Sequence, residues 1–412
     1  MLLTRFRRVP VLLALALAAL STGCANDDRP SADPPVGTPE PPSVRSVDDP
    51  EPRLAVTYDG GVRVLDATDG EVLLDEALDG FLRVNPAGDG RHFLVSRPGG
   101  FTLLDLGAWT VDHGDHEHSY ADDPALLDGT LPAEEPGHVV AHHGWTTLFD
   151  DGTGTMTSFE THDLDDPEEL ETETATTADP HHGVAARTHD GGWVRTVGTS
   201  EQRNGVEVVS SDGEVLAASD ACPGVHGEAF ARDVAVFGCE DGALVVDGTD
   251  IAKVRAPDAY GRIGNQAGHE DSPYVLGDYK TDPEAELERP TRVSVIDSRS
   301  ASLRLVDLGT SYSFRSLGRT PDGDGLVLGT DGALHVVDVR RAQVSASLPV
   351  VARWREPLDW EQPRPTLEVV GDTAYVTEPA TRQLHVVDLA TMTVTDSHTL
   401  AVTPDEVVGV TG

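Results

Sequence analysis

Histidine is the residue type in this chain whose number and spacing suggest chemistry. Sixteen histidines occur in 412 residues, and many of them stand in short groups, the densest being the HGDHEH segment 113–118. Neutral imidazole is the commonest protein ligand for Zn²⁺ and also suits Cu²⁺ and Ni²⁺. One short tract of this kind binds many metals weakly, so a specific site requires several groups to meet. The histidines that we consider as metal ligands are His113, His116, His118, His138, His181, His182 and His226.

The elements that must position these histidines are short strands. Apolar runs that end in Asp recur along the chain, for example at 62–66, 101–105 and 334–338, and turn residues such as Asp-Gly and Gly-Gly follow them. Such dipeptides favour tight hairpins. Repeats of about 35 to 60 residues, each with four strands, are typical of β-propeller blades. With no long helical periodicity, the sequence predicts an all-β fold that is a single β-propeller.

The number of blades follows from writing the strands out. One blade has strands at 81–85, 92–96, 101–105 and 109–112. Counting in this way gives eight four-stranded blades, and seven is the alternative because the copy at 156–159 is weak. The first blade lacks an inner strand. We expect the C-terminal strand at 405–410 to supply it, which would close the ring and remove the sheet edges.

Strand alternation then predicts where the histidines lie. Loops between blades open at one mouth of the ring, whereas hairpins between the first and second strands open at the other. All seven candidate ligands fall in loops between blades or at the start of an inner strand, so we expect them at one mouth. Zinc needs three or four ligands, which predicts one site and a looser collecting loop. His142 and His143 should face the opposite mouth, where a structural role is favoured over a second metal site.

Three cysteines are present: Cys24, Cys222 and Cys239. The last two should share one face of the propeller. In an exported protein two such cysteines favour a disulfide, with thiolate metal ligation as the alternative.

The N-terminal residues indicate export. Arginines are followed by an apolar run at 11–20, which is too short to span a bilayer and typical of a signal peptide, 1–23. The small residues before Cys24 resemble a bacterial lipobox, with its leucine one position early. Cys24 would then carry a lipid anchor at the cell membrane; without lipidation the protein would be secreted or periplasmic. Residues 24–52, rich in Pro, Asp and Ser, predict a disordered stalk, and 53–412 the propeller domain.

The charge of the chain limits its partners. A formal net charge of −41 disfavours nucleic acid and anionic lipid, so we expect membrane contact only through the N-terminal anchor.

These residues together resemble the AztD-type extracytoplasmic zinc metallochaperones. The resemblance rests on the tract at 113–118, on CPGVHGEA at 222–229 and on VFGCEDG at 236–242. Proteins of this family hand Zn²⁺ to the zinc-binding solute-binding protein of an ABC transporter, and they are usually soluble in the periplasm. The resemblance therefore implies zinc binding and transfer without enzymatic turnover. A metal-dependent propeller lyase or hydrolase and a non-catalytic interaction scaffold are the alternatives.

Overall fold

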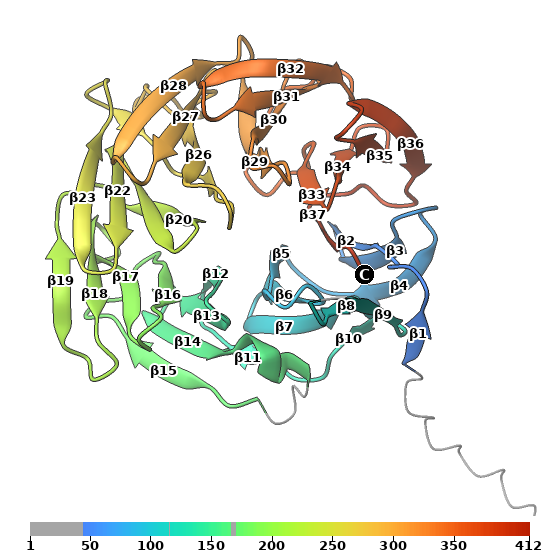
Figure 1. Ribbon diagram of the computed structural model, residues 1–412, viewed down its shortest axis with the longest axis horizontal. Coiled ribbons are helices and arrows are strands. Elements are labelled where there is room, and N and C mark those ends of the chain that lie inside the picture. Colours follow the sequence, from blue (N-terminus) through green and yellow to red (C-terminus); the bar gives the residue numbers. More distant parts are fainter. Residues whose placement is uncertain (1–43, 115, 166–169) are drawn as a thin grey trace, which may run out of the picture. The chain divides into compact units, whose positions relative to one another are not determined.

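Antiparallel sheets make up the described part of the chain, which comprises residues 44–114, 116–165 and 170–412 of the computed structural model. Eight of these sheets follow one another around a ring, as Figure 1 shows. The predicted all-β propeller is confirmed, and the eight sheets agree with the predicted count. In this part of the chain we find no helix of the length and apolarity that a membrane crossing requires.

The first four sheets run from an inner to an outer strand. The first contains β37 (Val407–Val410), β2 (Arg53–Tyr58), β3 (Gly61–Asp66) and β4 (Val72–Ala77). The second contains β5 (Arg83–Pro86), β6 (His92–Arg97) and β7 (Gly100–Asp105), with the short β10 (Ala125–Leu126) and β11 (Leu131–Pro132) on β7. The third contains β12 (Pro136–His142), β13 (Trp145–Asp150), β14 (Thr155–Glu160) and β15 (Glu173–Thr176), with the 3-10 helix η1 (Thr161–Asp165) after β14. The fourth contains β16 (Ala185–Arg187), β17 (Trp193–Gly198), β18 (Arg203–Val209) and β19 (Val215–Ser219).

The other four sheets repeat this order. The fifth contains β20 (His226–Ala231), β21 (Val234–Cys239), β22 (Asp241–Asp247) and β23 (Asp250–Arg255), with the short β24 (Gly261–Arg262) beside β22. The sixth contains β25 (Gln266–Ala267), β26 (Tyr274–Tyr279), β27 (Arg292–Asp297) and β28 (Ser302–Asp307). The seventh contains β29 (Tyr312–Arg319), β30 (Gly325–Gly329), β31 (Ala333–Asp338) and β32 (Gln343–Pro349). The eighth contains β33 (Leu367–Val370), β34 (Thr373–Glu378), β35 (Gln383–Asp388) and β36 (Thr393–Thr399).

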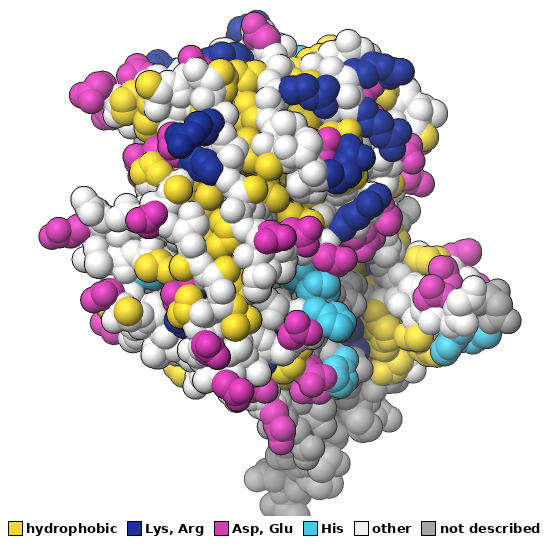
Figure 2. All heavy atoms as spheres, turned by 60° about the vertical axis from the view of Figure 1, so that its left-hand side comes forward, with side chains coloured by type: hydrophobic (Ala, Val, Ile, Leu, Met, Phe, Trp, Pro, Cys, Tyr) yellow, Lys and Arg dark blue, Asp and Glu magenta, His cyan; other side chains and the backbone are white. Residues whose placement is uncertain are grey.

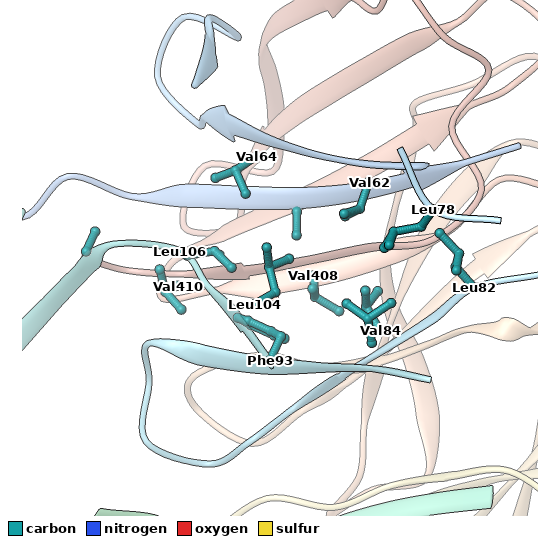
Figure 3. Packing of buried hydrophobic residues seen from close by; sticks show 13 residues of the cluster. Val62, Val64, Leu78, Leu82, Val84, Phe93, Leu104, Leu106, Val408 and Val410 are labelled. Carbon is teal, nitrogen blue, oxygen red and sulfur yellow. The ribbon is translucent and has the colours of Figure 1, made fainter. Parts of the chain in front are cut away.

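The C-terminal strand completes the first sheet. Strand β37 pairs with β2 in antiparallel register, from Arg53 opposite Val410 to Val56 opposite Val407. Val408 and Val410 enter the apolar core between the first and second sheets, where they meet Val62, Val64 and Leu104 (Figure 3). The last residues of the chain are therefore part of the core, as the sequence led us to expect.

One predicted strand is placed differently. The segment 109–112 belongs to β8 (Ala108–Asp112), which leaves the second sheet and pairs with β9 (Glu117–Ala121) in a separate three-stranded sheet. The chain turns away at Gly107, where the buried Arg53 guanidinium donates to the carbonyl oxygens of Leu106 and Asp122. The short β10 and β11 take the outer edge of β7 instead. Leu131 of β11 packs against the core between the second and third sheets, and Leu126 of β10 packs against the core between the first and second.

The third strand of this small sheet is β1 (Arg45–Val47), which pairs with β9. It lies inside the segment 24–52 that we predicted as a disordered stalk, so strand structure begins before Arg53. An Arg45–Glu51 ion pair, with N–O distance 2.6 Å, holds the turn that follows. The predicted signal peptide, Cys24 and the rest of the stalk lie outside the described residues.

The expected disulfide is confirmed. Cys222 in the loop after β19 is bonded to Cys239 at the end of β21, and both are fully buried in the core between the fourth and fifth sheets. The bond ties the loop that precedes β20 to the sheet that contains β20.

Because β37 closes the ring through the core, the effect of a charged substitution on the free energy of unfolding should depend strongly on its position. Val408 is 8% exposed in the core, whereas Val72 on the outer strand β4 is 46% exposed. We expect Val408→Asp to lower the free energy of unfolding by about 3 kcal/mol or more, because it buries a carboxylate without a partner. The control Val72→Asp should change it by less than about 1 kcal/mol. Urea unfolding followed by tryptophan fluorescence measures both; equal losses would contradict the closing role of β37.

Candidate metal centre

Three imidazoles from three successive inner strands or the loops before them meet at one mouth of the ring. His138 lies near the start of β12, His182 lies in the loop before β16, and His226 begins β20. One nitrogen of each ring lies within 4.8 Å of the other two, and the Nε2 atoms of His182 and His226 are 3.2 Å apart. Two ligands of a tetrahedral Zn²⁺ are separated by about 3.3 Å, given zinc–nitrogen distances of about 2.0 Å. The spacing therefore matches a zinc site.

The Nδ1 side of each ring faces an oxygen. His182 Nδ1 lies 2.5 Å from the Asp151 carboxylate, and His226 Nδ1 lies 2.7 Å from the carbonyl oxygen of Gly264. His138 Nδ1 is 3.6 Å from Glu228 Oε2. An Nδ1–H that donates to such an oxygen leaves the Nε2 lone pair for a metal. The lone pairs of His182 and His226 then point at each other, an arrangement that a cation between them stabilises.

Two glycines allow the Asp151 carboxylate and the Gly264 carbonyl to lie close to the imidazole rings. A Cβ at Gly137, next to His138, would lie 2.3 Å from an oxygen of Asp151. Gly227 has φ +67° and stands in a register shift between His226 and Glu228, where a Cβ would lie 2.7 Å from the Gly264 carbonyl. A β-bulge of this kind re-aims the neighbouring side chains. Larger residues at either position would push the oxygens away from the rings.

The surroundings keep two of the ligands unprotonated. Burial lowers the pKa of His226 to about 3, and the neighbouring His182, Arg262 and Arg203 contribute. Burial also lowers the pKa of His138, together with His182, His226 and Arg83. A metal competes with protons for the imidazole nitrogen, so a lowered pKa favours metal binding at neutral pH. We call Arg83, Arg203 and Arg262 the cationic collar.

A carboxyl group lies beside the three histidines. The Glu228 side chain is 14% exposed, and burial raises its pKa to about 8. The three histidines line a cavity of about 420 Å³ that also contains Phe81, Asn85 and Trp360. Figure 2 shows histidine side chains in a hollow of this face, with lysines and arginines gathered beside it. Three nitrogens, one nearby carboxyl and an open cavity are a donor set that suits Zn²⁺.

The structure does not bring His181 to this cluster. His181 is 2% exposed, and its Nδ1–H donates to the Asp179 carbonyl oxygen. Its Nε2 lies 3.0 Å from Thr196 Oγ1, and its ring packs against Phe149. His181 thus stabilises the loop that presents His182.

The remaining predicted ligands form a separate group. His113, His116 and His118 lie at the turn of the β8–β9 hairpin with ring centroids 4.9 to 5.3 Å apart, and all three are exposed. We expected them in a loop between blades; they lie outside the eight sheets because β8 leaves the second sheet. Figure 2 shows a second group of histidines on a lobe beside the first.

Sequence reasoning missed Asp151, which supports one of the three histidines. Asp151 precedes His182 by 31 residues, and nothing local in the sequence connects them. Glu228 had a detectable signal, because it stands two residues after His226 in the segment that carries the family resemblance.

Comparison with known proteins extends the resemblance to the whole propeller. No protein-family model matches the chain. The zinc chaperone AztD of Citrobacter koseri is 26% identical over 364 residues, which cover 85% of this chain and 84% of that protein. The crystal structure of Citrobacter koseri AztD gives a TM-score of 0.77 at 25% identity, covering 88% of this chain and 98% of the other. The resemblance to AztD is confirmed.

More distant structures are similar in fold alone. The dihydro-heme d1 dehydrogenase NirN, in complex with DHE, gives a TM-score of 0.53 at 12% identity and covers 86% of this chain and 74% of its own. AztD is thus more similar to this chain than NirN is, both in fold and in sequence.

The raised pKa of Glu228 predicts a pH dependence of stability in the metal-free protein. The unfolded chain releases this proton near pH 4.5, whereas the folded protein holds it until about pH 8. The stabilising contribution is therefore complete below pH 4.5 and is lost as the pH rises to 8, by at most about 5 kcal/mol. We expect Glu228→Gln to flatten the decrease of unfolding free energy between pH 5 and 8. Burial also raises the pKa of Glu368 to about 8, so part of the decrease of unfolding free energy with pH should remain in the Glu228→Gln variant.

The matched control is Glu214→Gln, which changes an exposed glutamate in the turn before β19. Urea unfolding at several pH values in the presence of a chelator measures the slopes. A Glu228→Gln slope equal to that of Glu214→Gln would show that Glu228 is ionised in the folded protein.

Proposed function

We propose that this protein binds Zn²⁺ as cargo at His138, His182 and His226 and passes it to the zinc-binding solute-binding protein of a zinc ABC transporter, without enzymatic turnover. The observation that carries the proposal is the meeting of three imidazoles whose Nδ1 sides face oxygens. The similarity to proteins named zinc chaperones supports the choice of metal and the transfer role.

The site is built for exchange as well as for binding. Three nitrogen ligands leave one coordination position for water or a ligand of the partner. The cationic collar repels a bound cation, because charges of like sign repel each other in a partly buried site. Both features favour stepwise replacement of one ligand at a time by those of a receiving protein.

The histidine hairpin is the second part of the proposal. We assign His113, His116 and His118 the role of collecting zinc ions, which their exposure and mutual spacing support. His181 is left out of the ligand set because its nitrogens are engaged in the loop.

We further propose that the protein works outside the cytoplasm, exported by residues 1–23 and anchored through a lipid on Cys24. The disulfide supports an oxidising compartment, since such bonds are rare in the cytosol. If Cys24 is not lipidated, the protein is secreted or periplasmic.

A metal-dependent hydrolase or lyase is the second candidate, and Glu228 is the observation that favours it. A carboxyl beside a three-histidine metal site can serve as acid or base toward a metal-bound water. Turnover of 4-nitrophenyl acetate by zinc-loaded protein, lost in Glu228→Gln with zinc retained, would support this candidate over the chaperone.

The proposed ligands predict a graded loss of zinc affinity. His182→Ala/His226→Ala should abolish tight binding, because one imidazole remains. Asp151→Asn should weaken it by about 10- to 100-fold, since His182 loses a charged hydrogen-bond acceptor. The control Asp190→Asn, at an exposed turn, should leave affinity unchanged. Competition with a chromophoric chelator measures affinity, and circular dichroism checks the fold; tight binding in the double variant would overturn the assignment.

The hairpin role predicts an effect on rate. His113→Ala/His116→Ala/His118→Ala should slow zinc uptake and transfer while the affinity of the three-histidine centre stays the same, because the hairpin supplies none of its ligands. Stopped-flow transfer to the zinc-free solute-binding protein is the measurement. His162→Ala, which removes another exposed histidine flanked by carboxylates, is the control. An unchanged transfer rate would contradict the collecting role.

A further inference from the structure

A second set of metal-ligating side chains lies at the opposite mouth of the ring. It comes from the hairpin turns of the same three sheets: His143 between β12 and β13, His189 between β16 and β17, and Asp233 between β20 and β21. His143 follows His138 by five residues of extended chain, about 17 Å along β12. The two sets therefore share no ligand.

The spacing of this set resembles that of the first centre. His143 Nε2 lies 3.7 Å from Asp233 Oδ1, close to the ligand separation of about 3.3 Å around tetrahedral zinc. The rings of His143 and His189 are 5.9 Å apart and nearly perpendicular, at 88°. In the first centre the His138 and His226 rings are 5.8 Å apart at 78°.

Neighbouring residues hold part of this set in place. The ring of His142 stacks on Phe230 at 3.6 Å and lies 3.9 Å from the ring of His143. Arg232, adjacent to Asp233, turns away and donates to the carbonyl oxygen of Asp271. Asp233 thus faces His143, and the guanidinium beside it is engaged elsewhere.

His143 has a positive φ, which five other non-glycine residues of the described chain share. His143 has φ +52° and Gly144 has φ +75°, as in a type I′ hairpin turn. Asn or Asp suits the first of these positions better, because a positive φ costs other side chains free energy. Ala342, Arg382 and Met392 have nearly the same φ in other turns, so the turn conformation itself does not require a histidine.

We propose that His143, His189 and Asp233 form a second site for a divalent transition-metal cation of the Zn²⁺ class. The sequence favoured a structural role for His143; the meeting of three turns changes that interpretation. Within the described residues only the first centre has one donor atom of each ligand within 4.8 Å of the others. In the second set the His189 side chain must therefore rotate before it can bind the same ion as His143 and Asp233. Its 87% exposure leaves room for this rotation. An exposed site with one preformed pair of ligands binds more weakly and exchanges faster than the first centre.

The test is Co²⁺ binding to the full chain, followed by visible absorption and by metal analysis after equilibrium dialysis. The starting protein is His113→Ala/His116→Ala/His118→Ala, which removes weak binding by the hairpin. Adding His143→Asn/Asp233→Asn should remove about one equivalent of weakly bound Co²⁺, with the tight equivalent retained. Asn suits the positive φ of His143, so the fold should be kept.

Two further variants complete the test. His189→Gln changes only an exposed ligand and should weaken the second equivalent at least tenfold with an unchanged melting temperature. His182→Ala/His226→Ala should lose the tightly bound equivalent of Co²⁺ and keep the weakly bound one. This variant therefore distinguishes a failure of the proposed function, which concerns the first centre, from a failure of the second site. Control His162→Ala should bind as the starting protein does. Unchanged Co²⁺ stoichiometry and absorption in both His143→Asn/Asp233→Asn and His189→Gln would overturn the second site.

Discussion

The pairing of β37 with β2 is the interaction on which the arrangement of this protein depends. It joins residues more than 350 positions apart and supplies the first sheet with its inner strand. Every sheet then has a neighbour on both sides, so the apolar faces of all eight are covered. The middle strands show the consequence: β7 is buried along its whole length, whereas outer strands such as β4 are largely exposed. A closed ring also gives each inner strand a fixed direction, and this direction sorts the loops into two mouths.

The candidate metal centre depends on that sorting. Three neighbouring sheets bring imidazoles to one mouth, but sorting alone would leave the rings free to turn. The Asp151 carboxylate and the Gly264 carbonyl orient two of them, and glycines at 137 and 227 provide the space. Burial and the cationic collar lower the pKa of His138 and His226, so the rings are ready to bind without first losing a proton. The net charge of the protein is negative, yet the arginines of the cationic collar lie next to the position that the zinc ion would occupy.

Sequence reasoning reached the fold because the information was periodic. Alternating apolar residues and turn dipeptides define strands locally, and the unpaired first blade points to the C-terminal strand. It brought the three histidines of the candidate metal centre to one mouth, because strand direction alone decides which mouth a residue faces. It could not separate His181 from His182, since adjacent residues share a loop and only packing against Phe149 and Thr196 decides which ring is buried.

The prediction that residues 109–112 belong to the second blade was wrong for a similar reason. The composition of β8 suits an outer blade strand, and the contacts that divert it come from Arg53, far away in the sequence. The two-residue strands β10 and β11 that replace it are too short to carry a pattern.

The small sheet of β1, β8 and β9 receives both ends of the described chain. Its first strand begins at Arg45, and Thr110 of β8 donates a hydrogen bond to the carbonyl oxygen of Gly412. Fluorescent labels, affinity tags or fused domains attached after Gly412 would therefore crowd the sheet that bears the histidine hairpin. A reporter inserted at an exposed outer hairpin, such as the turn at Asp212-Gly213 before β19, would leave the three-histidine centre and the histidine hairpin unobstructed.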